Sequence, residues 1–281
     1  GGLGISWDGG GYLLREGSVR AIASSGQAIV LGYIIAVAIG FNAYLYQRTA
    51  SIRDKMLVSI ILFAGVVAPL SRGPWVQVAL TYLILIILAP NSLVNLAKLT
   101  VVGIVVLLSV QISPYGAKIV EYLPFMGQVD AGNIEFRKNL LDNALIVVQE
   151  NLWFGSADYM QAEELEQMRS GGDGGIIDIV NSYIAITLSG GFVGLFLFVG
   201  YFASVGKSLF DSYSFSKKFI ANRLPLVKAM IALFAGIVVV IYTVSSIYFI
   251  PIIYWSIGAM AIALRKSLHD QSVKSMQNNK T

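Results

Sequence analysis

The 281-residue sequence contains no cysteine. Disulfides, zinc–thiolate sites, iron–sulfur clusters and cysteine nucleophiles are therefore excluded within this chain. The single histidine, His269, stands in the polar C-terminal tail, so a histidine-based metal site or catalytic dyad is excluded too. A Walker A phosphate-binding loop is also missing, which argues against ATP-driven transport. We expect neither a metal ion nor a cofactor.

Charge is scarce as well. Only 13% of the residues are charged and 56% are hydrophobic, whereas a soluble domain carries about 25% charged residues. The sequence therefore predicts an integral membrane protein, in which the net charge of +4 mainly sets topology. No nucleic-acid partner is expected. Because Gly1 follows no initiator Met and opens no signal-like segment, we expect the chain to begin inside a longer protein with further spans upstream.

The apolar runs predict an all-α, polytopic transmembrane bundle with about seven spans and a large, partly helical external loop. The expected spans are residues 26–46, 56–71, 74–90, 98–113, 179–206, 228–247 and 249–264. We divide the chain into an external segment with four spans (1–113), a periplasmic loop (114–178), three further spans (179–264) and a cytoplasmic tail (265–281).

Basic residues orient this bundle, because cytoplasmic segments carry an excess of Lys and Arg. They gather in residues 47–55 and 207–228, in the tail and at Lys98. These regions alternate correctly along the seven-span prediction and are assigned to the cytoplasm. The external regions are then residues 1–25, 70–74, 114–178 and the turn near 247–249.

The loop 114–178 is too long for a plain connector, and such loops are usually functional. Its apolar spacing predicts an amphipathic helix over residues 134–149. A second helix is expected over 156–169, with Ser156 as its N-cap. The glycine-rich stretch 171–175 is interpreted as a flexible hinge, suited to a lid.

Arginines stand at or just outside the outer ends of the predicted spans. They are Arg15, Arg20, Arg72, Arg137 and, more loosely, Arg169. A guanidinium at a membrane boundary costs free energy unless it is paired or hydrated, and its planar fork suits bidentate binding of phosphate. Several arginines facing one outer surface therefore suggest a lipid-linked phosphate or diphosphate as ligand. The alternatives are arginines that snorkel to lipid headgroups or lie on solvated surfaces.

Arg72 is the most informative of these arginines, since it lies between two apolar spans with almost no loop. Gly73 would let a substrate approach the backbone closely. Pro74 at a helix start leaves the first-turn amides pointing at an anion. In the alternative interpretation Arg72 snorkels to headgroups and Trp75 is an interface anchor.

Asp178 is the carboxylate nearest to a predicted membrane boundary, ahead of Asn181 and Tyr183 at the start of the fifth span. It is either a helix N-cap or a base that accepts the proton of a sugar hydroxyl. Glu150 and Asp158 are weaker candidates for the same role, so the general base stays open.

Trp153 belongs to a group of aromatic residues in the external loop. Its ring could stack on a sugar, although aromatic residues in loops more often serve packing.

Several short motifs resemble one family. They are Ser71-Arg72-Gly73 at an outer turn, Phe136-Arg137 at the start of a helix, the turn Asn151-Leu152-Trp153-Phe154-Gly155, the run Val180-Asn181-Ser182-Tyr183, and the run Gly190-Gly191-Phe192-Val193-Gly194-Leu195. Together with the large loop before a late span, they are similar to the O-antigen ligase and O-antigen polymerase superfamily of bacterial membrane proteins. The spacing from Arg15 to Gly26 also fits an Arg-to-Gly pattern of the superfamily's polymerases, which is a weaker signal than the other motifs.

The resemblance implies transfer of a glycan from undecaprenyl diphosphate to an acceptor hydroxyl on the periplasmic face of the bacterial inner membrane. It matches Arg72 and Arg137 to the family's arginines, and places Arg15 and Arg20 where external arginines precede the spans. Asn181, Tyr183 and Trp153 are then expected to contact sugar. Ligases of the family carry His where this chain has Val180, which favours a polymerase of O-antigen, capsule or exopolysaccharide repeats.

The nearby alternative is a ligase that transfers finished glycan to lipid A core or to protein. A chain-length regulator is an open further partner. Two alternatives belong to other classes, a transporter of lipid-linked saccharide and a non-catalytic membrane scaffold. A proton-coupled transporter usually needs an acidic residue near mid-membrane, and the predicted spans hold essentially none.

Overall fold

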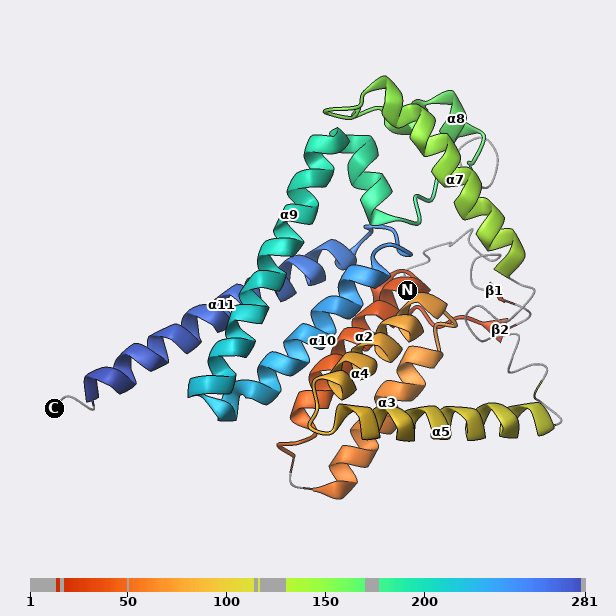
Figure 1. The fold of residues 1–281 in the computed structure, drawn as a ribbon. Coiled ribbons are helices and arrows are strands. Elements are labelled where there is room, and N and C mark those ends of the chain that lie inside the picture. Colours follow the sequence, from red (N-terminus) through yellow and green to blue (C-terminus); the bar gives the residue numbers. More distant parts are fainter. Residues whose placement is uncertain are drawn as a thin grey trace, which may run out of the picture.

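The computed structural model describes residues 14–15, 18–49, 51–113, 116, 130–169 and 177–278. These residues form a helical protein (Figure 1), as predicted. The helices are η1 (Ala23–Ser25), α2 (Ala28–Leu45), α3 (Ile52–Val67), α4 (Arg72–Ile87), α5 (Ser92–Ile112), α7 (Asp130–Glu150), η2 (Tyr159–Gln161), α8 (Glu163–Glu166), α9 (Ser182–Phe219), η3 (Ala221–Arg223), α10 (Leu224–Val240) and α11 (Phe249–Asn278). The strands β1 (Leu14–Arg15) and β2 (Ser18–Val19) form one short antiparallel pair.

Five helical segments among the described residues are long and apolar enough to cross a membrane. They are Ala28–Leu45, Ser92–Ile112, Ser182–Phe219, Ala221–Val240 and Phe249–Gln271. The apolar helix α4 is shorter, with 16 residues, and α3 opens with the charged residues Arg53, Asp54 and Lys55. A polytopic membrane protein is therefore confirmed, while spans at α3 and α4 stay predictions.

The main core joins α2, α9, α10 and α11. Its buried members include Tyr33 of α2, Phe202 of α9, Ile237 of α10 and Tyr254 of α11. Helix α4 packs closely on α10 because Gly236 lies against Thr81, where a methyl group would be 2.8 Å from the threonine Oγ1. Small residues permit such close helix contacts in membranes.

Helix α5 differs from the other α-helices because none of its residues is buried. In Figure 1 it turns away from the bundle after α4. Its exposed side chains are mostly Val, Leu and Ile, as expected for a helix in contact with lipid or with other spans.

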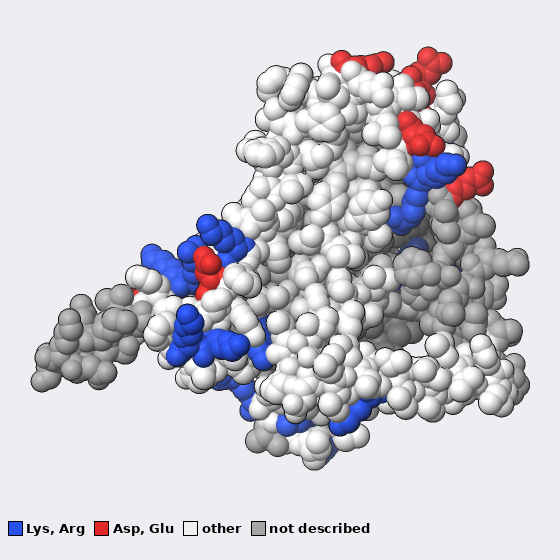
Figure 2. All heavy atoms as spheres, viewed as in Figure 1, with Lys and Arg blue, Asp and Glu red and all other residues white. Residues whose placement is uncertain are grey.

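Charge is segregated between the two ends of the molecule. In Figure 2 most Lys and Arg side chains gather along the lower edge and over α11, whereas Asp and Glu side chains lie mainly above, over α7 and α8. At the basic end Arg265 of α11 binds Asp211 of α9 at 2.9 Å. We refer below to the basic end and to the opposite, outer end.

The loop that carries α7 and α8 contains a small core of its own. Leu140, Ala144 and Val147 of α7 are buried against Leu165 of α8 and Leu188 of α9. The predicted amphipathic helix over 134–149 is confirmed and is longer, Asp130–Glu150.

The second helix expected in this loop, over 156–169, is wrong in length. Only η2 and the four-residue α8 form there. The Ser156 hydroxyl accepts a hydrogen bond from the Asp158 amide, and this local turn replaces the expected N-cap because serine side chains compete with helical backbone bonds. The glycine stretch 171–175 lies outside the described residues.

Candidate functional site

A non-helical segment separates α10 from α11 at the outer end. The span predicted over 228–247 is wrong at this point, because α10 ends at Val240 and α11 begins at Phe249. The intervening sequence includes Thr243, Ser245 and Ser246, residue types whose hydroxyls compete with helical bonds. Non-helical backbone at membrane depth is tolerated only where protein covers it or where it lines a polar cavity.

The start of α9 satisfies part of this backbone. The Ser182 amide donates to the Ile241 carbonyl at 2.9 Å, and the Ser182 hydroxyl donates to the Val244 carbonyl at 2.8 Å. The Ser246 hydroxyl donates in turn to the Ser182 Oγ at 2.8 Å. The two segments therefore form one hydrogen-bonded unit.

Asn181 and Tyr183, both predicted to contact sugar, help to hold this unit. The Asn181 Oδ1 caps α9 by accepting from the amides of Tyr183 and Ile184, at 2.9 and 3.3 Å. The Tyr183 hydroxyl donates to the Val238 carbonyl of α10 at 2.8 Å. Asn181 is buried and Tyr183 half-buried, so both have clear packing roles, and sugar contact stays a prediction.

Arg137 reaches the same segment from α7. Its Nη2 donates to the Thr243 carbonyl at 3.1 Å, and its Nη1 donates to the Val180 carbonyl at 3.4 Å. Arg137 as a whole residue is half-buried. Both carbonyl oxygens are neutral acceptors, and the two bonds hold the guanidinium against residues 180 and 243.

Asp178 lies beside this unit, in the non-helical segment just ahead of α9. Its Oδ1 accepts a 2.5 Å hydrogen bond from the Ser245 hydroxyl. The cap of α9 is Asn181, so the alternative interpretation of Asp178 as the N-cap is wrong. The Asp178 residue is exposed, so its carboxylate is oriented by Ser245 and still accessible to a ligand.

Arg72 is the first residue of α4, after the cap position Ser71. Leu70, just ahead, has a φ of +48°, a left-handed conformation that sharpens the turn between α3 and α4. A methyl group added at Gly73 would lie 3.3 Å from the Thr243 Oγ1. The start of α4 therefore contacts the segment whose carbonyl accepts from Arg137.

Arg20 is hydrogen-bonded to the turn between α3 and α4, just ahead of Arg72. Its Nε donates to the Pro69 carbonyl at 3.0 Å, and the Ala21 amide donates to the Ala68 carbonyl at 3.1 Å. Arg15 pairs through its backbone with Ser18 in the β1–β2 pair, and its side chain lies outside the described residues. The structure thus brings Arg20, Arg72, Arg137 and Asp178 to one end of the bundle.

Trp153 lies elsewhere, at the bend of α9. The helix breaks at Gly191, with φ +61° and ψ −162°, and Figure 1 shows α9 as a short first part and a long second part. The Trp153 carbonyl accepts from the Val193 amide at 3.1 Å, and the Leu152 carbonyl accepts from the Phe192 amide at 2.9 Å.

The motif turn 151–155 therefore caps the second part of α9. Gly155 has a φ of +66°, and the space beside it has no room for a side chain. A methyl group added there would lie 2.5 Å from the Leu188 carbonyl oxygen. The Trp153 side chain is 62% exposed. Nine residues of helix separate Asn181 from this bend, about 13 Å, so Trp153 is at the far end of a short helix from Asp178.

Three further charged residues of the loop were considered from the sequence: Arg169, Glu150 and Asp158. Arg169 forms a two-bond ion pair with Glu166, at 2.5 and 2.7 Å. The hydrogen bond from Arg169 lowers the pKa of the Glu166 carboxyl. Glu150 ends α7 and Asp158 precedes η2, both exposed.

Sequence reasoning missed Thr243 and Ser245. Both were placed inside an uninterrupted span, although the cluster of Thr and Ser in residues 243–246 was a usable signal for a break. The two residues provide the carbonyl that holds Arg137 and the hydroxyl that orients Asp178.

The fold and this cluster define a class: a multi-pass membrane protein with a polar site built where its helices are interrupted. A comparison with family models matches residues 57–199, half of the chain, to the O-antigen ligase family. The chain belongs to this family, as the motifs indicated, and the family implies glycan transfer of the O-antigen ligase or polymerase type. The matched range includes Arg72, Arg137 and Asp178. A search of curated proteins gave no match.

Proposed function

We propose that the protein is a polymerase that transfers oligosaccharide repeats from undecaprenyl diphosphate to an acceptor sugar hydroxyl at the outer, periplasmic end of the bundle. The observation that carries the proposal is the meeting of two arginine-bearing segments and one carboxylate on residues 243–245. Arg137 is bonded to the Thr243 carbonyl, the start of α4 contacts Thr243, and Asp178 accepts from Ser245.

The arginines suit the donor. A diphosphate that leaves the anomeric carbon gains negative charge, and guanidinium groups can stabilise that charge without a metal. Arg72 is the first residue of α4. The backbone amides in the first turn of this helix also favour anions, through the helix dipole. Arg20 is proposed to bind the diphosphate as well, and its bond to the Pro69 carbonyl holds it at the turn that precedes Arg72. Arg15 is proposed to bind the diphosphate from the β1–β2 pair.

Asp178 suits the acceptor. In the proposed step the acceptor hydroxyl oxygen forms a bond to the anomeric carbon, while the bond from that carbon to the diphosphate oxygen breaks. The hydroxyl proton passes to the Asp178 carboxylate, and undecaprenyl diphosphate leaves with the electron pair. Ser245 fixes the carboxylate through its 2.5 Å hydrogen bond, which is the orientation that a general base requires.

Polymerase is favoured over ligase by the environment of Val180. Ligases of this superfamily are expected to carry His there, whereas the Val180 side chain packs against the apolar core of the loop and only its carbonyl faces Arg137. Transfer to lipid A core or to protein is the remaining alternative within the same chemistry.

The test uses a null strain complemented with the full-length protein, either wild type or Arg72→Ala, at equal membrane levels. Lipid-linked and surface glycans are separated by size. For a polymerase, Arg72→Ala accumulates single repeats and loses long chains. Long lipid-linked chains that never reach the final acceptor would instead identify a ligase. An unchanged ladder would contradict the diphosphate site and favour the scaffold or transporter interpretation.

A further inference from the structure

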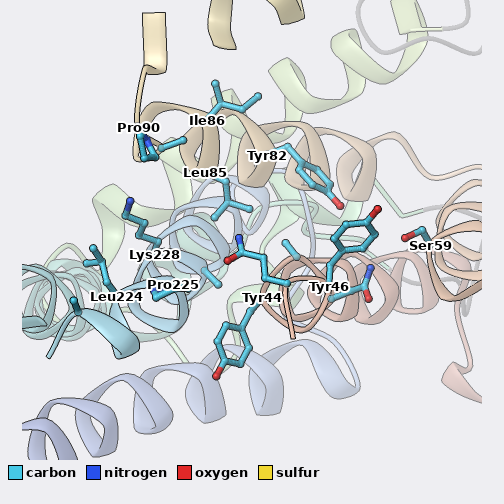
Figure 3. A pocket seen from close by; sticks show the side chains of 16 residues that line it. Tyr44, Tyr46, Ser59, Tyr82, Leu85, Ile86, Pro90, Leu224, Pro225 and Lys228 are labelled. Atoms are coloured by element: carbon cyan, nitrogen blue, oxygen red, sulfur yellow. The ribbon is translucent and has the colours of Figure 1, made fainter. Parts of the chain in front are cut away.

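A cavity of about 570 Å³ lies at the basic end, remote from the site described above. It is an open cavity lined by the C-terminal ends of α2 and α4, by Ser59 of α3, by Ala221 of η3 and by the N-terminal end of α10. Figure 3 shows Lys228 at one end of the cavity, near Pro90 and Leu224, and Tyr46, Tyr82 and Ser59 towards the other.

The surroundings of this cavity are positively charged. Lys228 is part of the lining, and among the described lining residues none is acidic. Two further cations cover lining tyrosines: Arg48 lies 4.9 Å from the ring centroid of Tyr44, and Lys55 lies 4.9 Å from that of Tyr46. The nearest carboxylate on these elements is the exposed Asp54, in the first turn of α3. Three cations and only one exposed carboxylate around the cavity favour the binding of an anion.

The cavity also has an apolar portion and lies beside a helix with an exposed apolar surface. Leu85, Ile86 and Leu224 line it. The neighbouring helix α3 exposes large apolar side chains such as Ile60, as a helix beside lipid does. Cations at a helix end, hydroxyl donors and an apolar wall together match a lipid with an anionic headgroup.

We propose that this cavity binds one anionic glycerophospholipid from the leaflet at the basic end. Its phosphate lies beside Lys228, the hydroxyls of Tyr46 and Tyr82 donate to headgroup and ester oxygens, and an acyl chain begins over Leu85 and Ile86. This site is separate from the proposed glycan transfer and does not depend on it, since it lies at the opposite end of the bundle.

The test is native mass spectrometry of the purified full chain in detergent. Dioleoyl phosphatidylglycerol and dioleoyl phosphatidylcholine are the probes, since they share acyl chains and differ in net charge. We expect one tightly retained phosphatidylglycerol and at least fivefold weaker phosphatidylcholine binding. Lys228→Gln should weaken the binding of phosphatidylglycerol about fivefold, which is the effect of removing one juxtamembrane charge.

Two further variants separate a built cavity from general attraction. Ala89→Trp fills the cavity from the lining without changing charge and should remove the bound lipid. Lys98→Gln removes a charge from exposed α5, outside the lining, and should leave binding unchanged.

Three results would overturn the proposal. One is equal binding of the two phospholipids, and another is equal weakening by Lys98→Gln and Lys228→Gln. The third is a preference for undecaprenyl phosphate over phosphatidylglycerol, which would assign the cavity to a polyprenyl lipid. The glycan ladder of the same variants, recorded in parallel, keeps these outcomes distinct from failure of the proposed transferase.

Discussion

Ser245 donates a hydrogen bond of 2.5 Å to the Asp178 carboxylate, although 67 residues separate them in sequence. The bond joins the segment ahead of α9 to the interruption between α10 and α11. Ser245 itself is buried while Asp178 is exposed, so the protein holds the carboxylate from one side and leaves its other side accessible. This arrangement makes Asp178 the best placed of the three external carboxylates considered as general base.

Substitution of Asp178 tests that role. Asp178→Asn keeps the shape and can still accept from Ser245, but cannot take up a proton. We expect transfer to fall about 10²- to 10⁴-fold, the usual contribution of a general base. Ser245→Ala should cost less, since the carboxylate survives in a less fixed orientation. The measurement is the rate of polymer formation in membranes, with Asp158→Asn as the control. A fully active Asp178→Asn would remove the carboxylate from the mechanism.

Replacement of Arg137 should reduce activity even when the new residue is lysine. A lysine keeps the positive charge but cannot donate in a planar fork to both the Val180 and the Thr243 carbonyls. We expect Arg137→Lys to lower activity about 10-fold and Arg137→Ala about 10²- to 10³-fold. The neighbouring exposed Lys138 provides the control, because Lys138→Gln should change little. Equal effects of Lys138→Gln and Arg137→Ala would point to a nonspecific surface charge.

Arg169 should be dispensable for transfer despite its place among the external arginines. Its guanidinium forms a two-bond ion pair with the exposed Glu166, the last residue of α8. Arg169→Gln is therefore expected to keep glycan yield within about twofold, in line with the small contribution of surface ion pairs. The yield of long chains in complemented cells checks this. A loss comparable to that of Arg72→Ala would show that the loop brings Arg169 to the substrate.

The bend in α9 provides a stability test with a matched pair of glycines. Gly191 has φ +61°, and an added methyl group would meet the Trp153 backbone, whereas Gly190 has nothing within 4 Å. Gly191→Ala should cost at least about 1–3 kcal/mol from backbone strain alone, and Gly190→Ala should be neutral or slightly stabilising. Heating followed by fluorescence-detected size-exclusion chromatography compares them. Equal thermal stability of the two variants would contradict the described bend.

Membrane orientation can be checked directly because the sequence contains no cysteine. Asp158 of the loop and Asn222 of η3 are both exposed. We expect an impermeant maleimide to label Asp158→Cys in intact spheroplasts and Asn222→Cys only after permeabilisation. The reverse pattern would place the arginine cluster on the cytoplasmic side and rule out the proposed periplasmic reaction.

Much of the fold could be predicted from the sequence because membrane helices are set by local composition. The apolar runs around α2, α9 and α11 are long enough to cross a bilayer whatever surrounds them. The apolar spacing of α7 similarly predicted which residues pack, and Leu140 and Ala144 are buried.

The candidate site was harder to predict because its decisive contacts are nonlocal. Arg72 and Arg137 stood out by their chemistry alone, but nothing local shows that Thr243 meets both of their segments. The end of α10 at Val240 was missed because the following residues are still largely apolar. The Ser246 hydroxyl donates to Ser182 of α9 and the Ser245 hydroxyl donates to Asp178, contacts that hydropathy does not register.

The bend at Gly191 has a consequence for biogenesis. The turn 151–155 is synthesised before residues 188–193, yet the Leu152 and Trp153 carbonyls accept from the Phe192 and Val193 amides of that later segment, and the adjoining Ser156 amide donates to the Leu188 carbonyl. The loop can therefore reach its final form only after α9 has left the insertion machinery. Chaperones or proteases that meet the chain before that point would encounter an unfinished loop.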